Sequence, residues 1–194
     1  MDSESGIGLE LVQRQITLSL YNDLNMAIDE QQGLWQTRDE AWADLTGNSP
    51  DFVEIEYVEA NHFYPGHKPS LIENPAPDNY PNISVMCYQG RPSAEVLDQA
   101  SNFIITCDIE AMVKGANESE TDARTHRTVE AIHNVLTNNN RLDGLTSGWD
   151  NDPIIQITDI FKKKEENSYG EYWFWQAVRL RYSTTKHNKL PSWA

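Results

Sequence analysis

Apolar residues recur at every third or fourth position near the start of the chain, a spacing that predicts an amphipathic α-helix. The helix is expected over residues 9 to about 30, with Gly33 as its stop signal. A short second helix is expected over 37–45, and Gly47 would end it. The apolar stripe of the first helix consists of Leu9, Val12, Ile16, Leu20, Leu24 and Ile28.

Alternation of apolar and polar residues predicts five strands, because successive strand side chains point to opposite faces of a sheet. In the third of them, Ile105 and Ile109 would face the core, whereas Asp108 and Glu110 would lie on the solvated face. The expected strand ranges are 52–58, 82–89, 102–113, 154–164 and 173–184.

A polar helix is expected over 118–138, between the third and fourth strands. Ser119 and Asp122 approximate a capping box at its start. Three asparagines at 138–140 would end it, and the chain would then turn through 143–144. The apolar stripe of this helix consists of Val129, Ile132 and Leu136.

The order of elements is helix, three strands, helix, two strands, which disfavours a parallel doubly wound sheet. We therefore expect an α+β fold. It would have an antiparallel or mixed sheet of about five strands, two main helices packed on one face, and a long Pro-rich loop. With 194 residues and no recognisable linker, residues 1–194 are expected to form a single domain.

The Pro-rich loop is the segment 59–81, which contains five prolines and separates two expected strands. Its apolar and aromatic content, including Phe63, Tyr64 and Leu71 beside His67, is too high for a simply solvated loop. Two interpretations remain open: the segment docks on a partner, or it folds back on its own domain.

The charge excludes some function classes. The chain carries 30 acidic and 15 basic side chains, a net charge of −15. Such a surface does not bind duplex DNA by neutralising phosphates. No run of about 18 or more apolar residues occurs, so no membrane partner is expected, and the acidic first residues do not resemble a secretory signal.

The two cysteines, Cys87 and Cys107, lie in apolar strand patterns. Pairing across neighbouring strands is one possibility. We favour two reduced core thiols in a cytosolic product, because cytosolic proteins rarely keep disulfides.

Candidate chemistry is sparse. His126, Glu130 and His133 are four and three residues apart on one helix face, but the order lacks the His-Glu-x-x-His arrangement of metal hydrolases. We expect a polar stripe there, with a small metal-dependent hydrolase as the alternative. The spacing of His62 and His67 matches no helical ligand pair, and no Cys or further His is nearby. No catalytic, cofactor-binding or metal residue is therefore expected, no cofactor is implied, and the chain is not expected to be an enzyme.

The last strand carries an unusual aromatic and basic face. Trp173 and Trp175 share that face with Arg179 and Arg181, and all four would point away from the core. Exposed aromatic side chains beside arginine are typical of protein interfaces. The alternatives are a cover made by the chain's own loop and cross-strand pairing of the arginines with Asp159 or a similar group. The candidate interface residues are Phe63, Tyr64, His67, Leu71, Trp173, Trp175, Arg179 and Arg181.

The segment 124–184 resembles the C-terminal part of phage tail terminator proteins, also called tail completion or minor tail proteins. Three features carry the resemblance: the helix run Val129-Glu130-Ala131-Ile132-His133-Asn134-Val135-Leu136, the turn Leu142-Asp143-Gly144-Leu145, and two closing strands that end in 175–182. These are patterns of residue type, and the 59–81 segment is longer than the smallest family members carry.

The resemblance implies a structural virion protein of the tail or neck, assembled in the host cytoplasm. It would form a homo-hexameric ring that caps the tail tube, stops tube polymerisation and docks to the head connector or a stopper or neck protein. DNA would pass an acidic lumen without specific binding. The alternative within the virion is a head-completion, stopper or other neck protein.

Overall fold

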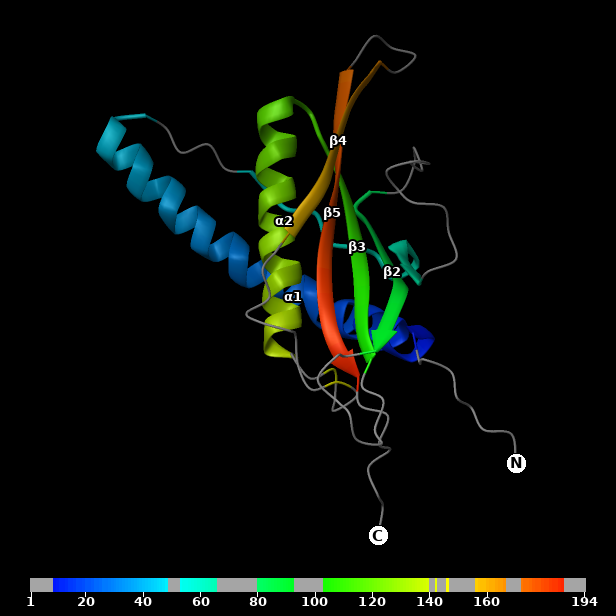
Figure 1. Ribbon diagram of the computed structural model, residues 1–194. Coiled ribbons are helices and arrows are strands. Elements are labelled where there is room, and N and C mark those ends of the chain that lie inside the picture. The colour runs from blue at the N-terminus through cyan, green and yellow to red at the C-terminus, as the bar shows by residue number, and fades with distance from the viewer. Residues whose placement is uncertain are drawn as a thin grey trace, which may run out of the picture.

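The computed structural model describes residues 9–48, 53–65, 80–92, 103–139, 142, 146, 156–166 and 172–186. These residues form two long helices, one 3-10 turn and five strands (Figure 1). In chain order the elements are α1 (Leu9–Thr46), η1 (Ala60–His62), β1 (Phe63–Pro65), β2 (Asn82–Pro92), β3 (Phe103–Gly115), α2 (Glu118–Asn138), β4 (Gln156–Glu166) and β5 (Tyr172–Lys186).

The strands form one mixed sheet in the order β1-β2-β3-β5-β4. Only β1 and β2 are parallel, and the other pairs are antiparallel. Both helices pack on the same face of the sheet, where the odd-numbered residues of β3 meet the apolar stripes of α1 and α2. The expected α+β class, the mixed five-stranded sheet and the two helices on one face are confirmed.

The core follows the predicted periodicities. Fully buried aliphatic side chains come from α1, β3, α2 and β5, so the apolar face of each element meets the others in one cluster. The largest of them include Ile16, Leu20, Leu24, Ile28, Ile105, Ile109, Ile132, Leu136 and Leu180.

Helix α1 is longer than predicted. The expected stop at Gly33 is wrong, because the helix runs on through the region of the second predicted helix to Thr46. Gly33 has no neighbouring atom within 4 Å of the place where a Cβ would lie, and glycine in mid-helix costs only about 1 kcal/mol. Gly47, with a φ of 70°, follows the last helical residue as predicted.

The predicted strand at 52–58 is also wrong, since residues 53–59 form no strand. Side-chain amides of α1 take up the backbone groups that a strand partner would bind. The N–H of Ile55 donates to Gln32 Oε1 at 3.1 Å, and the N–H of Val58 donates to Asn25 Oδ1 at 3.0 Å. Ile55 and Val58 are buried, so the segment is an extended strap across α1.

Helix α2 has the predicted bounds, but its N-cap is Asn117 and not Ser119. The Asn117 side chain accepts a hydrogen bond from the N–H of Glu120 at 2.9 Å. The Glu120 carboxylate accepts one from the N–H of Ala116 at 3.0 Å, which satisfies a second amide near the start of the helix. The predicted turn at 143–144 lies outside the described residues.

The expectation of two free thiols is wrong. Cys87 and Cys107 are direct cross-strand partners with a Cα–Cα distance of 4.1 Å, and the structure joins them in a disulfide. The adjacent register of β2 and β3 supplies the geometry that a cross-strand bridge needs.

The described beginning of the Pro-rich segment folds back on its own domain. Residues Phe63–Pro65 form β1, with Phe63 opposite Ile83 and Tyr64 opposite Ser84. Residues 66–79 lie outside the described part of the chain.

Candidate assembly interface

The exposed large apolar side chains of the described residues gather on one helix. Seven of the eight lie on α1, and the eighth, Tyr57, lies in the strap that crosses it. Exposed apolar side chains that lie close together are typical of interaction surfaces. The seven residues on α1 are Leu11, Leu18, Tyr21, Met26, Leu34, Trp42 and Leu45.

The buried stripe of α1 continues beyond the point where the chain itself covers it. From Leu24, Ile28 and Gln31, all buried, spacings of four and three lead on through Trp35 and Arg38 to two exposed apolar residues. These are Trp42 and Leu45, 66% and 77% exposed. In Figure 1 this last part of α1 passes α2 and extends away from the sheet. We call residues 34–46 the arm.

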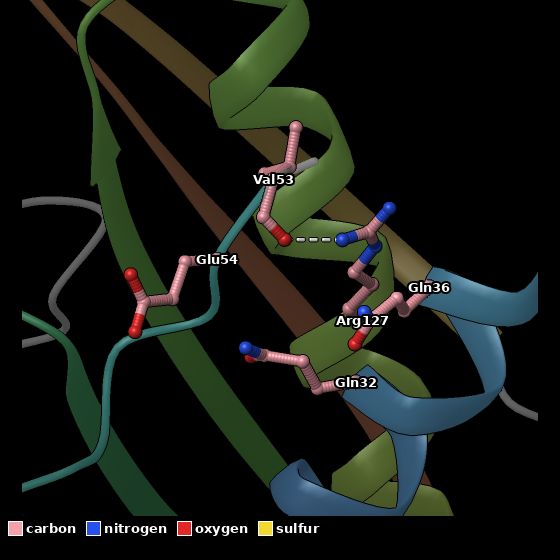
Figure 2. Close-up of a pocket in the computed structure, with 5 residues that line it drawn as sticks. All are labelled: Gln32, Gln36, Val53, Glu54 and Arg127. Atoms are coloured by element: carbon pink, nitrogen blue, oxygen red, sulfur yellow. Dashed lines mark hydrogen bonds between the residues drawn. The ribbon is translucent and has the colours of Figure 1, made fainter. Parts of the chain in front are cut away.

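The arm is held by Arg127 of α2, a buried arginine (Figure 2). Its Nη2 donates to Asp39 Oδ2 of the arm at 3.0 Å, and its Nη1 donates to the backbone carbonyl of Val53 in the strap. Its guanidinium also lies 5.1 Å from the ring centroid of Trp35. One side chain therefore ties together the arm, the strap and α2.

Trp35 reinforces this joint. Its indole Nε1–H donates to Glu130 Oε2 of α2 at 3.0 Å. The guanidinium of Arg38, one turn further along α1, also lies over this ring, 5.3 Å from its centroid. The arm is thus tied to α2 at Trp35 and Asp39, and Ala43 beyond them is buried as well, whereas Trp42 and Leu45 are exposed.

A small cavity of about 240 Å³ lies beside the joint. Figure 2 shows its lining, which combines two α1 amides with the strap and Arg127. The lining residues can form hydrogen bonds, but none of them is a typical nucleophile. At about 30 Å³ per water molecule, the cavity has room for a few waters. The lining residues are Gln32, Gln36, Val53, Glu54 and Arg127.

Four of the predicted interface residues belong to the Pro-rich segment. Phe63 and Tyr64 are 9% and 8% exposed, so they serve the subunit's own core. Phe63 packs edge-on against Tyr21 with ring centroids 5.6 Å apart. His67 and Leu71 lie outside the described residues.

Arg179 and Arg181 bind within the chain. Arg179 donates from Nη2 and Nε to Glu110 Oε1 at 2.7 and 2.9 Å. Arg181 donates from Nε and Nη2 to the two carboxylate oxygens of Asp108 at 2.9 and 3.1 Å. The alternative interpretation, cross-strand pairing with Asp159 or a similar group, is therefore confirmed, and the partners are two acidic residues of β3. Asp108 and Glu110 are buried, so the predicted solvated face is wrong at these positions.

Trp173 and Trp175 lie in β5, opposite Glu165 and Lys163 of β4. Their side chains are outside what the structure describes. Their role in an interface stays a prediction.

The two histidines of α2 are not brought together with other metal ligands in the part of the chain that the structure describes. His126 is exposed, and Glu130 accepts the Trp35 indole. Burial lowers the pKa of His133, whose Nδ1 has no hydrogen-bond partner. Within the described ranges, no group of three His, Cys, Asp or Glu side chains is placed to hold a metal ion.

Sequence reasoning missed the arm and Arg127. The heptad-like spacing from Leu24 through Gln31 to Trp42 and Leu45 was a usable signal, but Gly33 interrupted it. No sequence signal pointed to Arg127, because a charged residue beside the apolar stripe of a helix is normally expected to face solvent.

Comparison of the sequence with protein-family models and with curated proteins finds no match. Neither α1 nor α2 has a stretch apolar enough, over sufficient length, to cross a membrane.

Proposed function

We propose that the chain is a structural subunit of the phage head-to-tail interface, a tail terminator that forms a ring on the tail tube. Such a ring caps the tube, stops its polymerisation and docks to the head connector. Two things support the proposal: the resemblance carried by α2 and the two closing strands, and the apolar surface of α1. The second is the observation that carries it.

The apolar surface of α1 supports a subunit of an assembly in particular. A monomer would gain nothing from an arm with exposed Trp42 and Leu45 at its end. The buried Arg127 holds that arm in place, so its exposure is built into the fold. An element held rigidly away from its own core is pre-organised to meet another molecule.

The charge fits a ring through which DNA passes. A net charge of −15 repels phosphates and keeps free subunits apart. Contacts between subunits must then form where the local surface is apolar. The partners in this proposal are further copies of the chain, the tail tube protein and a connector or neck protein.

Purified protein added to cognate tail tubes that lack their terminator tests the proposal. We expect a ring at one tube end in electron micrographs, arrest of tube elongation, and restored joining to filled heads. Binding to filled heads without binding to tubes would favour a stopper or neck protein. Stoichiometric transition metal together with hydrolytic turnover would favour the hydrolase.

A further inference from the structure

We propose that the disulfide between Cys87 and Cys107 is a redox-controlled latch on the outer end of β2. In the dithiol state residues 89–92 of β2 separate from β3 by local opening, and oxidation fixes them in place. This inference rests on the proposed function in one respect, the passage of a virion protein from a reducing host cytoplasm to an oxidising exterior.

The latch lies at a weak point of β2. On one side, β1 pairs only with residues 83–85, so this support ends two residues before Cys87. On the other side, the register between β2 and β3 shifts between Cys87 and Gln89, which marks a β-bulge. Residues 89–92 therefore form a short outer pairing with residues 103–106, and the bulge separates it from the rest of the ladder.

The cysteine pair adds no hydrogen bond of its own to the ladder. The N–H of Cys87 donates to Gln13 Oε1 of α1 at 3.1 Å and so does not bind β3. Antiparallel partners of this kind are non-hydrogen-bonded pairs, in which the two Cα atoms lie closest together, and the Cα–Cα distance to Cys107 is 4.1 Å. The disulfide is thus the direct link between the strands at this position, and its reduction leaves Cys87 and the bulged residue after it without one.

The two sulfurs differ in access. Cys107 is fully buried, whereas Cys87 is partly buried at the margin of the core. An external thiolate therefore attacks the sulfur of Cys87, the S–S bond breaks, and the Cys107 thiolate leaves and takes up a proton. A second thiol attacks the mixed disulfide, which releases the Cys87 thiol and the disulfide of the reductant. The protein gains two electrons and two protons, and the reverse reaction with glutathione disulfide closes the latch.

Opening concerns one edge of the sheet and leaves the rest of it paired. Residues 103–106 of β3 are paired on their other side with residues 183–186 of β5. Residues 89–92 of β2, in contrast, have β3 as their one strand partner in the part of the chain that the structure describes. Without the disulfide this end of β2 opens locally, because few hydrogen bonds and no second strand hold it, and the opening uncovers a backbone edge of β3.

Hydrogen exchange of the oxidised and the dithiothreitol-reduced protein tests the latch. Residues 87–91 are compared with residues 176–180 of β5, which lie between two strands. We expect reduction to raise the ratio of the two exchange rates about tenfold or more. A disulfide that only constrains the unfolded chain accelerates exchange in both segments and leaves the ratio unchanged, a result that overturns the inference. In the control protein, Cys87→Ala/Cys107→Ala, the ratio should match that of the reduced protein and should not respond to dithiothreitol.

Single variants test which sulfur reacts. Cys107→Ala leaves the partly buried thiol of Cys87, and Cys87→Ala leaves the buried thiol of Cys107. With glutathione disulfide, we expect Cys107→Ala to form the mixed disulfide about tenfold or more faster than Cys87→Ala, as measured by mass spectrometry. Equal rates contradict access to the latch through Cys87.

Rapid acid quenching and alkylation of cells that produce the protein separates this inference from the proposed function. We expect free thiols in the cells and a disulfide after purification in air. A disulfide that is already complete in the cytoplasm overturns the latch but leaves the tail terminator standing if the protein caps tubes. Redox-dependent exchange at residues 87–91 in a protein that never binds tubes overturns the proposed function and supports the latch.

Discussion

Removing the anchor of the arm should cost several kilocalories per mole, although Arg127 lies outside the predicted core. We consider Arg127→Leu, which keeps an apolar stem but removes the guanidinium. The substitution leaves the Val53 carbonyl without its donor, Asp39 without its ion partner, and Trp35 without the cation on its ring.

The magnitude follows from these three losses. A partly buried carbonyl left unsatisfied costs about 1–3 kcal/mol. The ion pair contributes about 1 kcal/mol after allowance for solvent screening, because the Asp39 side chain is 23% exposed. The cation–π contact adds about 0.5–1 kcal/mol. We therefore expect Arg127→Leu to lower the free energy of unfolding by about 2.5–5 kcal/mol.

Arg38→Leu is the matched control, because Arg38 stacks on the same indole but is exposed. It should cost no more than about 1 kcal/mol. Urea denaturation measures both values, and hydrogen exchange of the arm amides should be faster in Arg127→Leu alone. Equal stabilities for the two variants, with unchanged exchange in the arm, would refute the anchoring role.

Three further predictions concern the fold. Gly115→Ala should lower stability by about 1–3 kcal/mol, because its Cβ would lie 2.5 Å from a threonine hydroxyl of α2, whereas Gly33→Ala should raise it by about 0.5–1 kcal/mol in open space within a helix. The same sign in urea denaturation for both would contradict this reasoning. Burial lowers the pKa of His133, so below pH 6.5 the unfolded state binds more protons than the folded state, and stability falls as the pH falls. In His133→Gln, the melting temperature should therefore fall less between pH 6.5 and lower pH. The same dependence of melting temperature on pH in both proteins would exclude a contribution of His133. Alkylation should find Cys87 and Cys107 protected until a reductant is added, and reduction should cost about 3 kcal/mol for a separation of 20 residues; free thiols in the native protein would contradict the bridge.

The sequence predicts correctly those elements in which the spacing of the apolar residues matches the face that is buried. Helix α2 has the predicted bounds because its stripe of Val129, Ile132 and Leu136 faces the sheet throughout. The odd-numbered positions of β3 face the core for the same reason. Periodicity is reliable here because each of these elements has one buried face along its whole length.

Patterns within a short stretch of sequence fail to predict the structure where contacts with residues far away in the chain determine it. Residues 53–58 alternate between apolar and polar side chains as a strand does. The side-chain amides of Gln32 and Asn25 accept hydrogen bonds from two of their backbone N–H groups, so these groups need no neighbouring strand. The acidic residues of β3 look solvated until the register places Arg179 opposite Glu110. Such partners are separated by tens of residues, so no window of sequence contains both.

The energetics of the two candidate surfaces favour α1 over the arginine face of β5 as the assembly element. A neighbour that recruited Arg179 would have to separate it from Glu110, a fully buried carboxylate, and breaking such a pair costs about 3–5 kcal/mol. Covering Trp42 requires no such exchange. About two thirds of a side chain that buries up to roughly 250 Å² is exposed, and burying it gains up to about 4 kcal/mol. A strand that already satisfies its charges is stable without a neighbour, whereas the arm becomes more stable only when another molecule covers it.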